Sequence, residues 1–337
     1  MRFLQVLLAI ILAAGINSCK KAEPVHITGE AQGTYYSILY FDSLNRDFHP
    51  EIDSILKRFD QSVSLWVPGS VLSRVNRNDT TVVLDGFFTG NFNLSQKISE
   101  KTDGAFDITV SPLVEVWGFG YESRKHVDKH IVDSLLPLIN YKNIKIVKGK
   151  VVKSDPRMKI DFNAIAQGYS VDVIGNFLET KGIKNYLIDI GGEVKAKGEK
   201  AGGKPWKIGI EKPAADKNAS RSLKAVITLK NKSIATSGSY RKYFEENGVR
   251  YSHTIDPKTG YPVRHSLLSV SVIAGNTAVA DAYATAFMVM GYKKALDFVR
   301  NDTSLEAFFI WSDTVTGNYK TYATKGFENR IVKIYGK

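Results

Sequence analysis

Residues 234–263 hold the densest group of side chains that could act on a substrate. The pattern predicts a strand that ends in a hydroxyl-rich turn, then a second strand that carries His253 and runs into Asp256. An imidazole can accept a proton near neutral pH, so His253 is a candidate general base. A surface hairpin with satisfied polar groups explains the same residues, because Pro257 and Gly260 supply turn geometry.

The stretch also contains the three residue types of a serine-hydrolase triad, in Ser237, His253 and Asp256. No Gly-x-Ser-x-Gly sequence surrounds the serine, and we therefore reject that class. Asp256 follows His253 by three residues, where it either orients the imidazole or caps the turn. The spacing leaves both roles open, and we carry His253 and Asp256 forward as the candidate catalytic residues.

Residues 276–291 predict a helix that Asn276 caps and Gly291 ends. Alternate alanines make this helix thin, so that other backbone can come close to it. Asp281 and Thr285 are four residues apart and therefore share one face. A carboxylate and a hydroxyl are hard oxygen ligands, which suit Mg²⁺ better than a soft metal. The alternative is an acid that a neighbouring loop satisfies.

Residues 161–168 predict a turn from a strand into a helix, and the turn is rich in small side chains. Such a turn leaves backbone amides and carbonyls free to approach a diphosphate or a cation. A tightly packed turn would need the same small residues. Glycines at 29–33 and 191–192 offer two more places of close backbone approach, although a bulge between strands explains the second pair equally well.

Taken together, these stretches resemble the flavin:protein FMN transferases of the ApbE type, and the resemblance covers roughly residues 27–335. Six matches in the same order are far more specific than one glycine-rich turn. The matching stretches are residues 29–35, 103–110, 160–172, 191–193, 234–263 and 276–291.

The resemblance implies a reaction as well as a family. FAD would be the substrate, Mg²⁺ the cofactor, and a Thr or Ser hydroxyl of an acceptor protein would take FMN while AMP leaves. With water as the acceptor, the same site would be a Mg²⁺-dependent FAD pyrophosphatase. A flavin-binding lipoprotein without turnover is the third alternative, and the presence of His253, Asp281 and Thr285 makes it the least favoured.

The resemblance also implies roles for single residues. It places Trp66 against the flavin, residues 105–107 at the isoalloxazine ring, Glu193 on the adenine side and Tyr240 along the phosphate path. Gln167 departs from the pattern, because many relatives have lysine or glutamate there, and a neutral amide compensates no charge. The implied FAD-binding residues are Gln32, Trp66, Ala105, Phe106, Asp107, Asp161, Gln167, Glu193, Thr236, Ser237 and Ile255. The implied metal site is Ala164, Asp281, Ala284 and Thr285.

Residues 1–18 have the layout of a secretory signal, with one arginine, an apolar run and small residues before Cys19. This is the only cysteine, so no internal disulfide can form. Its position resembles a bacterial lipoprotein site. We therefore expect an exported protein that lipid on Cys19 holds on a membrane, facing the periplasm or the cell exterior. Residues 19–26 would form the lipidated tether and residues 27–337 the transferase domain.

The composition is that of an ordinary globular protein, with 43% hydrophobic and 24% charged residues. The net charge of +12 favours anionic partners. It is spread along the chain rather than gathered in one basic run, so nucleic acid is not an expected partner.

Strands interrupted by several helices, without regular βαβ alternation, predict one large α+β domain with helices packed on mixed or antiparallel sheets. No G-x-G-x-x-G follows a strand, so a Rossmann fold is not expected. The tail from residue 293 predicts a helix and three strands that close the sheet. The other predicted helices span residues 50–59, 87–101, 131–139, 161–180 and 276–291.

Overall fold

An eight-stranded sheet forms the centre of the structure, a computed structural model that describes residues 23–120, 127–213, 222–239, 243–246, 249–313, 316 and 318–336. Its order is β1-β2-β5-β6-β9-β12-β13-β14, and every neighbouring pair is antiparallel. The strands are β1 (Glu23–Ala31), β2 (Thr34–Asp42), β5 (Tyr186–Ile190), β6 (Glu193–Lys197), β9 (Lys232–Gly238), β12 (Leu267–Ala274), β13 (Glu306–Ser312) and β14 (Tyr319–Ala323). The predicted α+β fold is confirmed, and it is not Rossmann-like.

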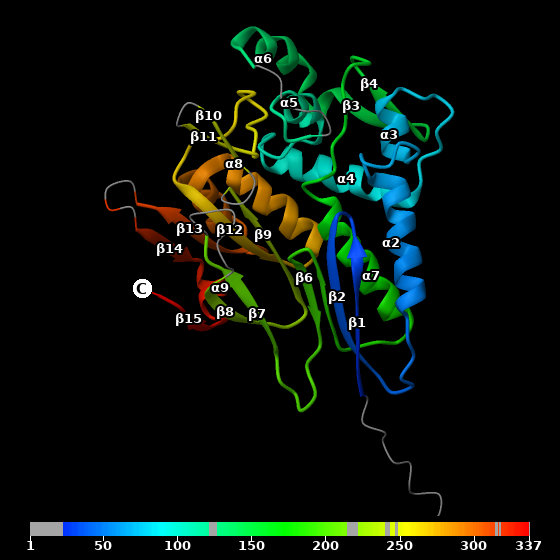
Figure 1. Ribbon diagram of the computed structural model, residues 1–337, viewed down its shortest axis with the longest axis vertical. Helices are drawn as coiled ribbons and strands as arrows, with labels where there is room; N and C mark the ends of the chain where they lie inside the picture. The colour runs from blue at the N-terminus through cyan, green and yellow to red at the C-terminus, as the bar shows by residue number, and fades with distance from the viewer. Residues whose placement is uncertain are drawn as a thin grey trace, which may run out of the picture.

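Helices pack on one face of this sheet (Figure 1). Helices α7 and α8 lie directly on the central strands and contact each other. Helix α2 packs against α7, and α4 packs against α8. The helices are α2 (His49–Val63), α3 (Val71–Asn76), α4 (Gly86–Lys101), α5 (Ser111–Val116), α6 (Lys129–Leu135), α7 (Ala166–Thr180), α8 (Thr277–Asn301) and α9 (Lys325–Glu328). Within the described part of the chain, no helix has the length and apolarity needed to cross a bilayer.

A three-stranded sheet of order β15-β8-β7 packs on the opposite face. Trp206 and Phe327 from this layer share a buried core with Ile234 and Phe308 of the central sheet. The predicted tail is corrected here, because β13 and β14 join the central sheet whereas β15 pairs with β8 beyond the short helix α9. The strands are β7 (Trp206–Glu211), β8 (Leu223–Leu229) and β15 (Ile331–Ile334).

Two hairpins complete the strands. One joins β3 (Ile144–Val147) to β4 (Lys150–Lys153) and turns at Gly149, as predicted. The other joins β10 (Tyr243–Glu246) to β11 (Val249–Ser252). The first predicted strand of the 234–263 stretch is β9, which lies between β6 and β12. The stretch as a whole is therefore not a surface hairpin, since its first strand is a central strand of the sheet.

The helix boundaries differ from the prediction at several places, and two of the differences bear on the site. Helix α7 begins at Ala166, because the residues before it form a turn in which the Ile165 and Ala166 amides both donate to the Phe162 carbonyl. Helix α8 breaks at Gly291, as predicted, but resumes and continues to Asn301. Gly291 has φ 74° and ψ 169°, a conformation essentially restricted to glycine.

Candidate active site

Helices α7 and α8 come closest at Gly168, in the first turn of α7. The Gly168 amide donates to Asp281 Oδ2 over 3.1 Å. A β-carbon on Gly168 would lie 2.6 Å from the Thr277 carbonyl oxygen and 2.9 Å from the Asp281 β-carbon, so a larger residue has no room. The close approach, here called the α7–α8 contact, brings the predicted metal ligand Asp281 to the start of α7.

Glu193 reaches the same end of α7 from the sheet. It follows a two-residue hairpin turn in which Gly191 and Gly192 both have positive φ, 63° and 110°, so this pair forms a tight turn rather than a bulge. The Gln167 side-chain amide donates to the Ile190 carbonyl over 2.8 Å and to a carboxylate oxygen of Glu193. Adjacent residues of α7 thus hold the two acids, which we call the carboxylate pair.

The carboxylate pair, with Asp281 buried and Glu193 half-buried, has no compensating positive charge. Asp281 is 7% exposed, and burial raises its pKa. Burial, followed by the charge of Asp281, raises the pKa of Glu193. The donors to the pair, the Gly168 and Gln167 N–H groups, are neutral, and no ion pair in the described part of the chain includes either acid. Two like charges in a low dielectric oppose each other's ionisation, and a bound cation would relieve that cost.

The oxygen donors around the pair suit a hard cation such as Mg²⁺. Ser237 Oγ lies 3.3 Å from Thr285 Oγ1, one turn along α8 from Asp281. The described residues hold no group of three or more His, Cys, Asp or Glu side chains placed to bind a metal, so hydroxyl, carbonyl or substrate oxygens would complete the shell. Ala284 is buried beside Thr285 on α8.

Thr236 does not join this cluster. Successive residues of a strand face opposite sides of the sheet. Ser237 faces α8, whereas Thr236 Oγ1 bonds Ser271 Oγ at 2.7 Å across β9 and β12. The structure therefore separates two residues that the sequence places together. Tyr240, which the resemblance places along the phosphate path, lies outside the described residues.

Asp161 shapes the turn that contains Ala164. Its amide donates to the Ile108 carbonyl over 2.7 Å, and its Oδ1 accepts from the Asn163 amide at 2.6 Å. Burial raises the pKa of Asp161 to about 6. The bond to Ile108 joins this turn to the predicted flavin-contacting residues 105–107.

Within that segment, Ala105 and Phe106 are buried. The Asp107 carboxylate accepts from the Thr109 and Tyr141 amides, at 2.8 and 2.9 Å, so both of its oxygens hold the local loop in place. Burial raises the pKa of Asp107. Trp66 is 57% exposed.

Gln32 occupies the turn between β1 and β2, with φ 55°. Its Oε1 accepts from Ser170 Oγ on α7 at 3.3 Å. Its Nε2 is buried and has no hydrogen-bond partner within the described chain. A buried donor without a partner is costly, so this atom fits an acceptor on a bound ligand.

His253 follows β11, and its ring meets Phe119 edge to face at a centroid distance of 6.3 Å. Asp256 caps the next turn, because its Oδ1 accepts from the Lys258 amide at 2.9 Å. Of the two roles that the sequence leaves open for Asp256, the structure therefore supports the turn. Ile255 is buried and pairs with Pro262.

Comparisons with known proteins agree with this geometry. The profile of the ApbE family matches residues 32–309. This chain belongs to the ApbE family. The predicted membership is confirmed.

Two FAD:protein FMN transferases are close to this ApbE-family chain in sequence. The one from Haemophilus influenzae is 35% identical, over 90% of this chain and 91% of its own. The one from Vibrio cholerae is 34% identical, over 98% and 99%. Among solved structures, the flavin transferase ApbE from Vibrio cholerae has a TM-score of 0.81 at 32% identity, covering 92% of this chain and 99% of its own. The apo flavinyl transferase ApbE of Pseudomonas stutzeri has a TM-score of 0.82, also at 32% identity, covering 92% and 97%.

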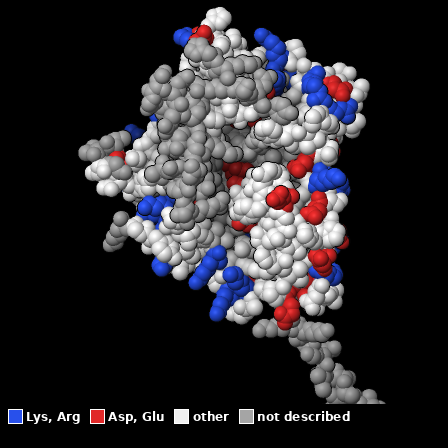
Figure 2. Space-filling view, viewed as in Figure 1, with Lys and Arg blue, Asp and Glu red and all other residues white. Residues whose placement is uncertain are grey.

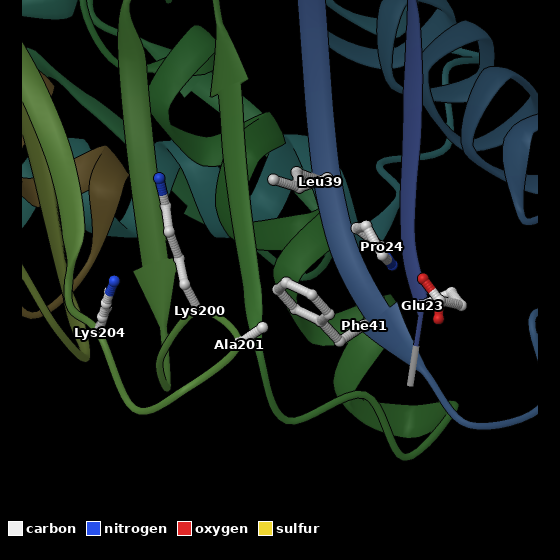
Figure 3. Close-up of a pocket in the computed structure, with 7 residues that line it drawn as sticks. All are labelled: Glu23, Pro24, Leu39, Phe41, Lys200, Ala201 and Lys204. Atoms are coloured by element: carbon white, nitrogen blue, oxygen red, sulfur yellow. The ribbon is translucent and has the colours of Figure 1, made fainter. Parts of the chain in front are cut away.

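The surface is hollowed on one face. Figure 2 shows acidic side chains inside this hollow. A second, open cleft lies at the other end of the β1–β2 hairpin from Gln32 (Figure 3). It contains none of the predicted site residues, and we assign it no part in the site. Its lining is Glu23, Pro24, Leu39, Phe41, Lys200, Ala201 and Lys204.

Sequence reasoning missed two residues that support the site. Asn76 exchanges two hydrogen bonds of 2.8 Å with the backbone of Ile160 and so fixes the segment before Asp161. Asp172 caps α8, whereas the predicted cap, Asn276, makes no side-chain capping bond. Both contacts join residues more than 80 positions apart, and no local pattern signals them.

Gly168→Ala tests the α7–α8 contact. At an open helix position, alanine would favour the helix by up to about 1 kcal/mol over glycine. At Gly168 we expect a loss of about 1–3 kcal/mol instead, because the new methyl group overlaps backbone of α8. Urea unfolding measures this, with Gly69→Ala, which meets open space, as the control. Equal stability of the two variants would contradict the contact.

Asp161→Asn tests the buried acid. The folded protein holds this proton up to about pH 6, whereas the unfolded chain releases it near the ordinary aspartate pKa of 3.8. We expect the unfolding free energy of the unmodified protein to fall, relative to the variant, as the pH rises from about 4 to 7, by up to about 3 kcal/mol. Urea titrations across this range measure the difference. The exposed Asp297→Asn is the control, and a difference that is constant with pH would refute the prediction.

Proposed function

We propose that this protein transfers FMN from FAD to a Thr or Ser hydroxyl of an acceptor protein and releases AMP. The observation that carries the proposal is the carboxylate pair at the start of α7. Asp281 is buried and Glu193 half-buried, and both have only neutral donors. Such a pair suits a substrate that arrives with a cation. Membership of the ApbE family and the names of the relatives support the same reaction.

Mg²⁺ is the cation that the donor set fits best. Asp281 and Thr285 would hold it, with carbonyl oxygens of Ala164 and Ala284. When bound, Mg²⁺ neutralises charge on phosphate oxygens and so makes the phosphorus easier to attack. Glu193 adds negative charge beside Asp281 and strengthens the preference for a cation.

The remaining chemistry belongs to the chain itself. His253 takes the proton from the acceptor hydroxyl, and the hydroxyl oxygen forms a bond to the flavin-side phosphorus of FAD. The bond from that phosphorus to the oxygen bridging toward AMP breaks, and AMP leaves with that oxygen. FMN is thereby joined to the acceptor through a phosphoester.

The flavin dinucleotide would lie between the helices and the β1–β2 turn. The unpartnered Gln32 Nε2 would donate to it, and the half-exposed Trp66 would offer a ring surface for stacking. Residues 105–107 form a buried wall that Asp161 joins to the start of α7. Asp256 keeps the turn after His253 in shape rather than acting on substrate.

A flavinylation assay tests the reaction. The purified protein, FAD, Mg²⁺ and an exported acceptor domain with an Ala-Thr site are mixed, and in-gel flavin fluorescence and AMP release are followed. We expect Asp281→Ala and EDTA to reduce labelling at least about 100-fold, because the cation is lost. We expect His253→Gln to slow labelling by about 10²-fold or more through loss of the base.

The exposed Asp297→Asn is the matched control and should label as the unmodified protein does. AMP and free FMN without a labelled acceptor would identify a pyrophosphatase instead. Tight FAD binding without either product would identify a flavin carrier and would refute catalysis.

We also propose that the protein is exported and anchored by lipid on Cys19. Glu23, where β1 begins, is the fourth residue after Cys19, and four residues of extended chain reach at most about 14 Å. The β1–β2 hairpin then runs about 26 Å to its turn at Gln32. An anchored protein would therefore hold its site at the end of the hairpin that is remote from the bilayer.

Cys19→Ser tests the anchor. We expect the unmodified protein to incorporate labelled palmitate and to sediment with membranes, whereas the variant should do neither. Flavinylation by the purified variant should be unchanged, because Cys19 precedes β1 in the sequence and is none of the predicted site residues. Membrane retention of the variant without a lipid label would contradict the assignment.

A further inference from the structure

Asp172 lies one helical turn after Gly168 on α7 and contacts the first residues of α8. Its carboxylate accepts from the Thr277 amide at 3.1 Å and from the Ala278 amide at 2.9 Å. The helix N-terminus carries partial positive charge and unpaired amides, so a carboxylate is its best partner. The start of α8 is therefore fixed by a neighbouring helix.

The Asp172 bonds and the α7–α8 contact form two successive links between the same helices. Gly168 bonds Asp281, and Asp172, four residues later, bonds Thr277, four residues earlier on α8. Residues four apart in a helix share one face. The two links therefore fix both the distance between the helices and the rotation of α8, which sets where the Asp281 carboxylate points.

Asp172 also reaches the sheet. Lys195 Nζ lies 3.0 Å from Asp172 Oδ1, and the two side chains are only 16% and 14% exposed. Lys195 lies two residues after Glu193 on β6, so both side chains face the same side of the strand. Asp172 thus joins all three elements that carry the carboxylate pair and its donors.

We propose that Asp172 is a positioning residue that sets the affinity of the carboxylate pair for a divalent cation. It touches neither the cation nor the substrate. It holds α8 and β6 against α7, so that Asp281 and Glu193 meet at the start of α7. The inference rests on the metal site of the proposed function and adds the residue that assembles it.

Asp172→Asn tests this. The asparagine side chain keeps the shape and one acceptor oxygen, but it lacks the negative charge that interacts with the N-terminus of α8 and with Lys195. The dissociation constant of Mg²⁺ alone is measured by calorimetry on the FAD-free protein. We expect it to rise at least about tenfold, as for residues that orient metal ligands. The control is Asp85→Asn. Asp85 caps α4 by accepting from the Phe88 amide at 2.9 Å, and α4 carries neither acid of the pair nor any of its donors.

The thermal midpoint separates positioning from general stability. We expect both variants to lower it, with only Asp172→Asn weakening Mg²⁺ binding. An unchanged Mg²⁺ constant in Asp172→Asn, or an equal weakening in both variants, would overturn the inference. Lys195→Met leaves the α8 cap in place and should weaken Mg²⁺ binding by about threefold. This variant replaces Asp172→Asn in the test if Asp172→Asn does not fold.

Asp281→Ala separates the metal site itself from the positioning role of Asp172. Loss of Mg²⁺ binding in Asp281→Ala with a normal constant in Asp172→Asn would refute the positioning role alone. Equal Mg²⁺ binding by Asp281→Ala and the unmodified protein would refute the metal site, and the positioning role with it.

Discussion

The close contact between α7 and α8 is the constraint on which the rest of the site depends. A single residue without a side chain, Gly168, lets the two helices approach until an amide of one reaches a carboxylate of the other. Because interiors are close-packed, such an approach permits only one relative placement of the helices. Everything carried by either helix near this point inherits that placement, including Gln167 on α7 and Thr285 on α8.

The contact also brings a buried acid, Asp281, close to a half-buried one, Glu193. Burying carboxylates beside one another is unfavourable unless their charge is compensated. The fold holds Asp281 and Glu193 with neutral donors only, so this part of the molecule is arranged for a ligand rather than for maximum stability. Local conflict between stability and arrangement is typical of functional sites. A bound cation, as proposed above, would supply the positive charge that the chain itself leaves out.

Gln167 illustrates how a substitution can be misjudged from its charge alone. In the sequence, the resemblance marks Gln167 only as a neutral residue that compensates no charge. In the structure its amide links the Ile190 carbonyl to the Glu193 carboxylate, and so holds the end of β5 and the start of β6 against α7. Its contribution is geometric. It depends on Ile190 and Glu193, which lie 23 and 26 positions further along the sequence.

The sequence by itself determined what depends on near neighbours. Helical spacing put Asp281 and Thr285 on one face, Gly149 and Gly291 marked a turn and a helix break, and the ordered motifs identified the family. Only the tertiary structure decided that Ser237 faces α8 while Thr236 faces away, since that depends on how β9 sits in the sheet. The physical reason is range. Turn and helix preferences act over a few residues, whereas contacts such as that of Asp172 with α8 join residues 105 positions apart, and chain geometry alone selects them.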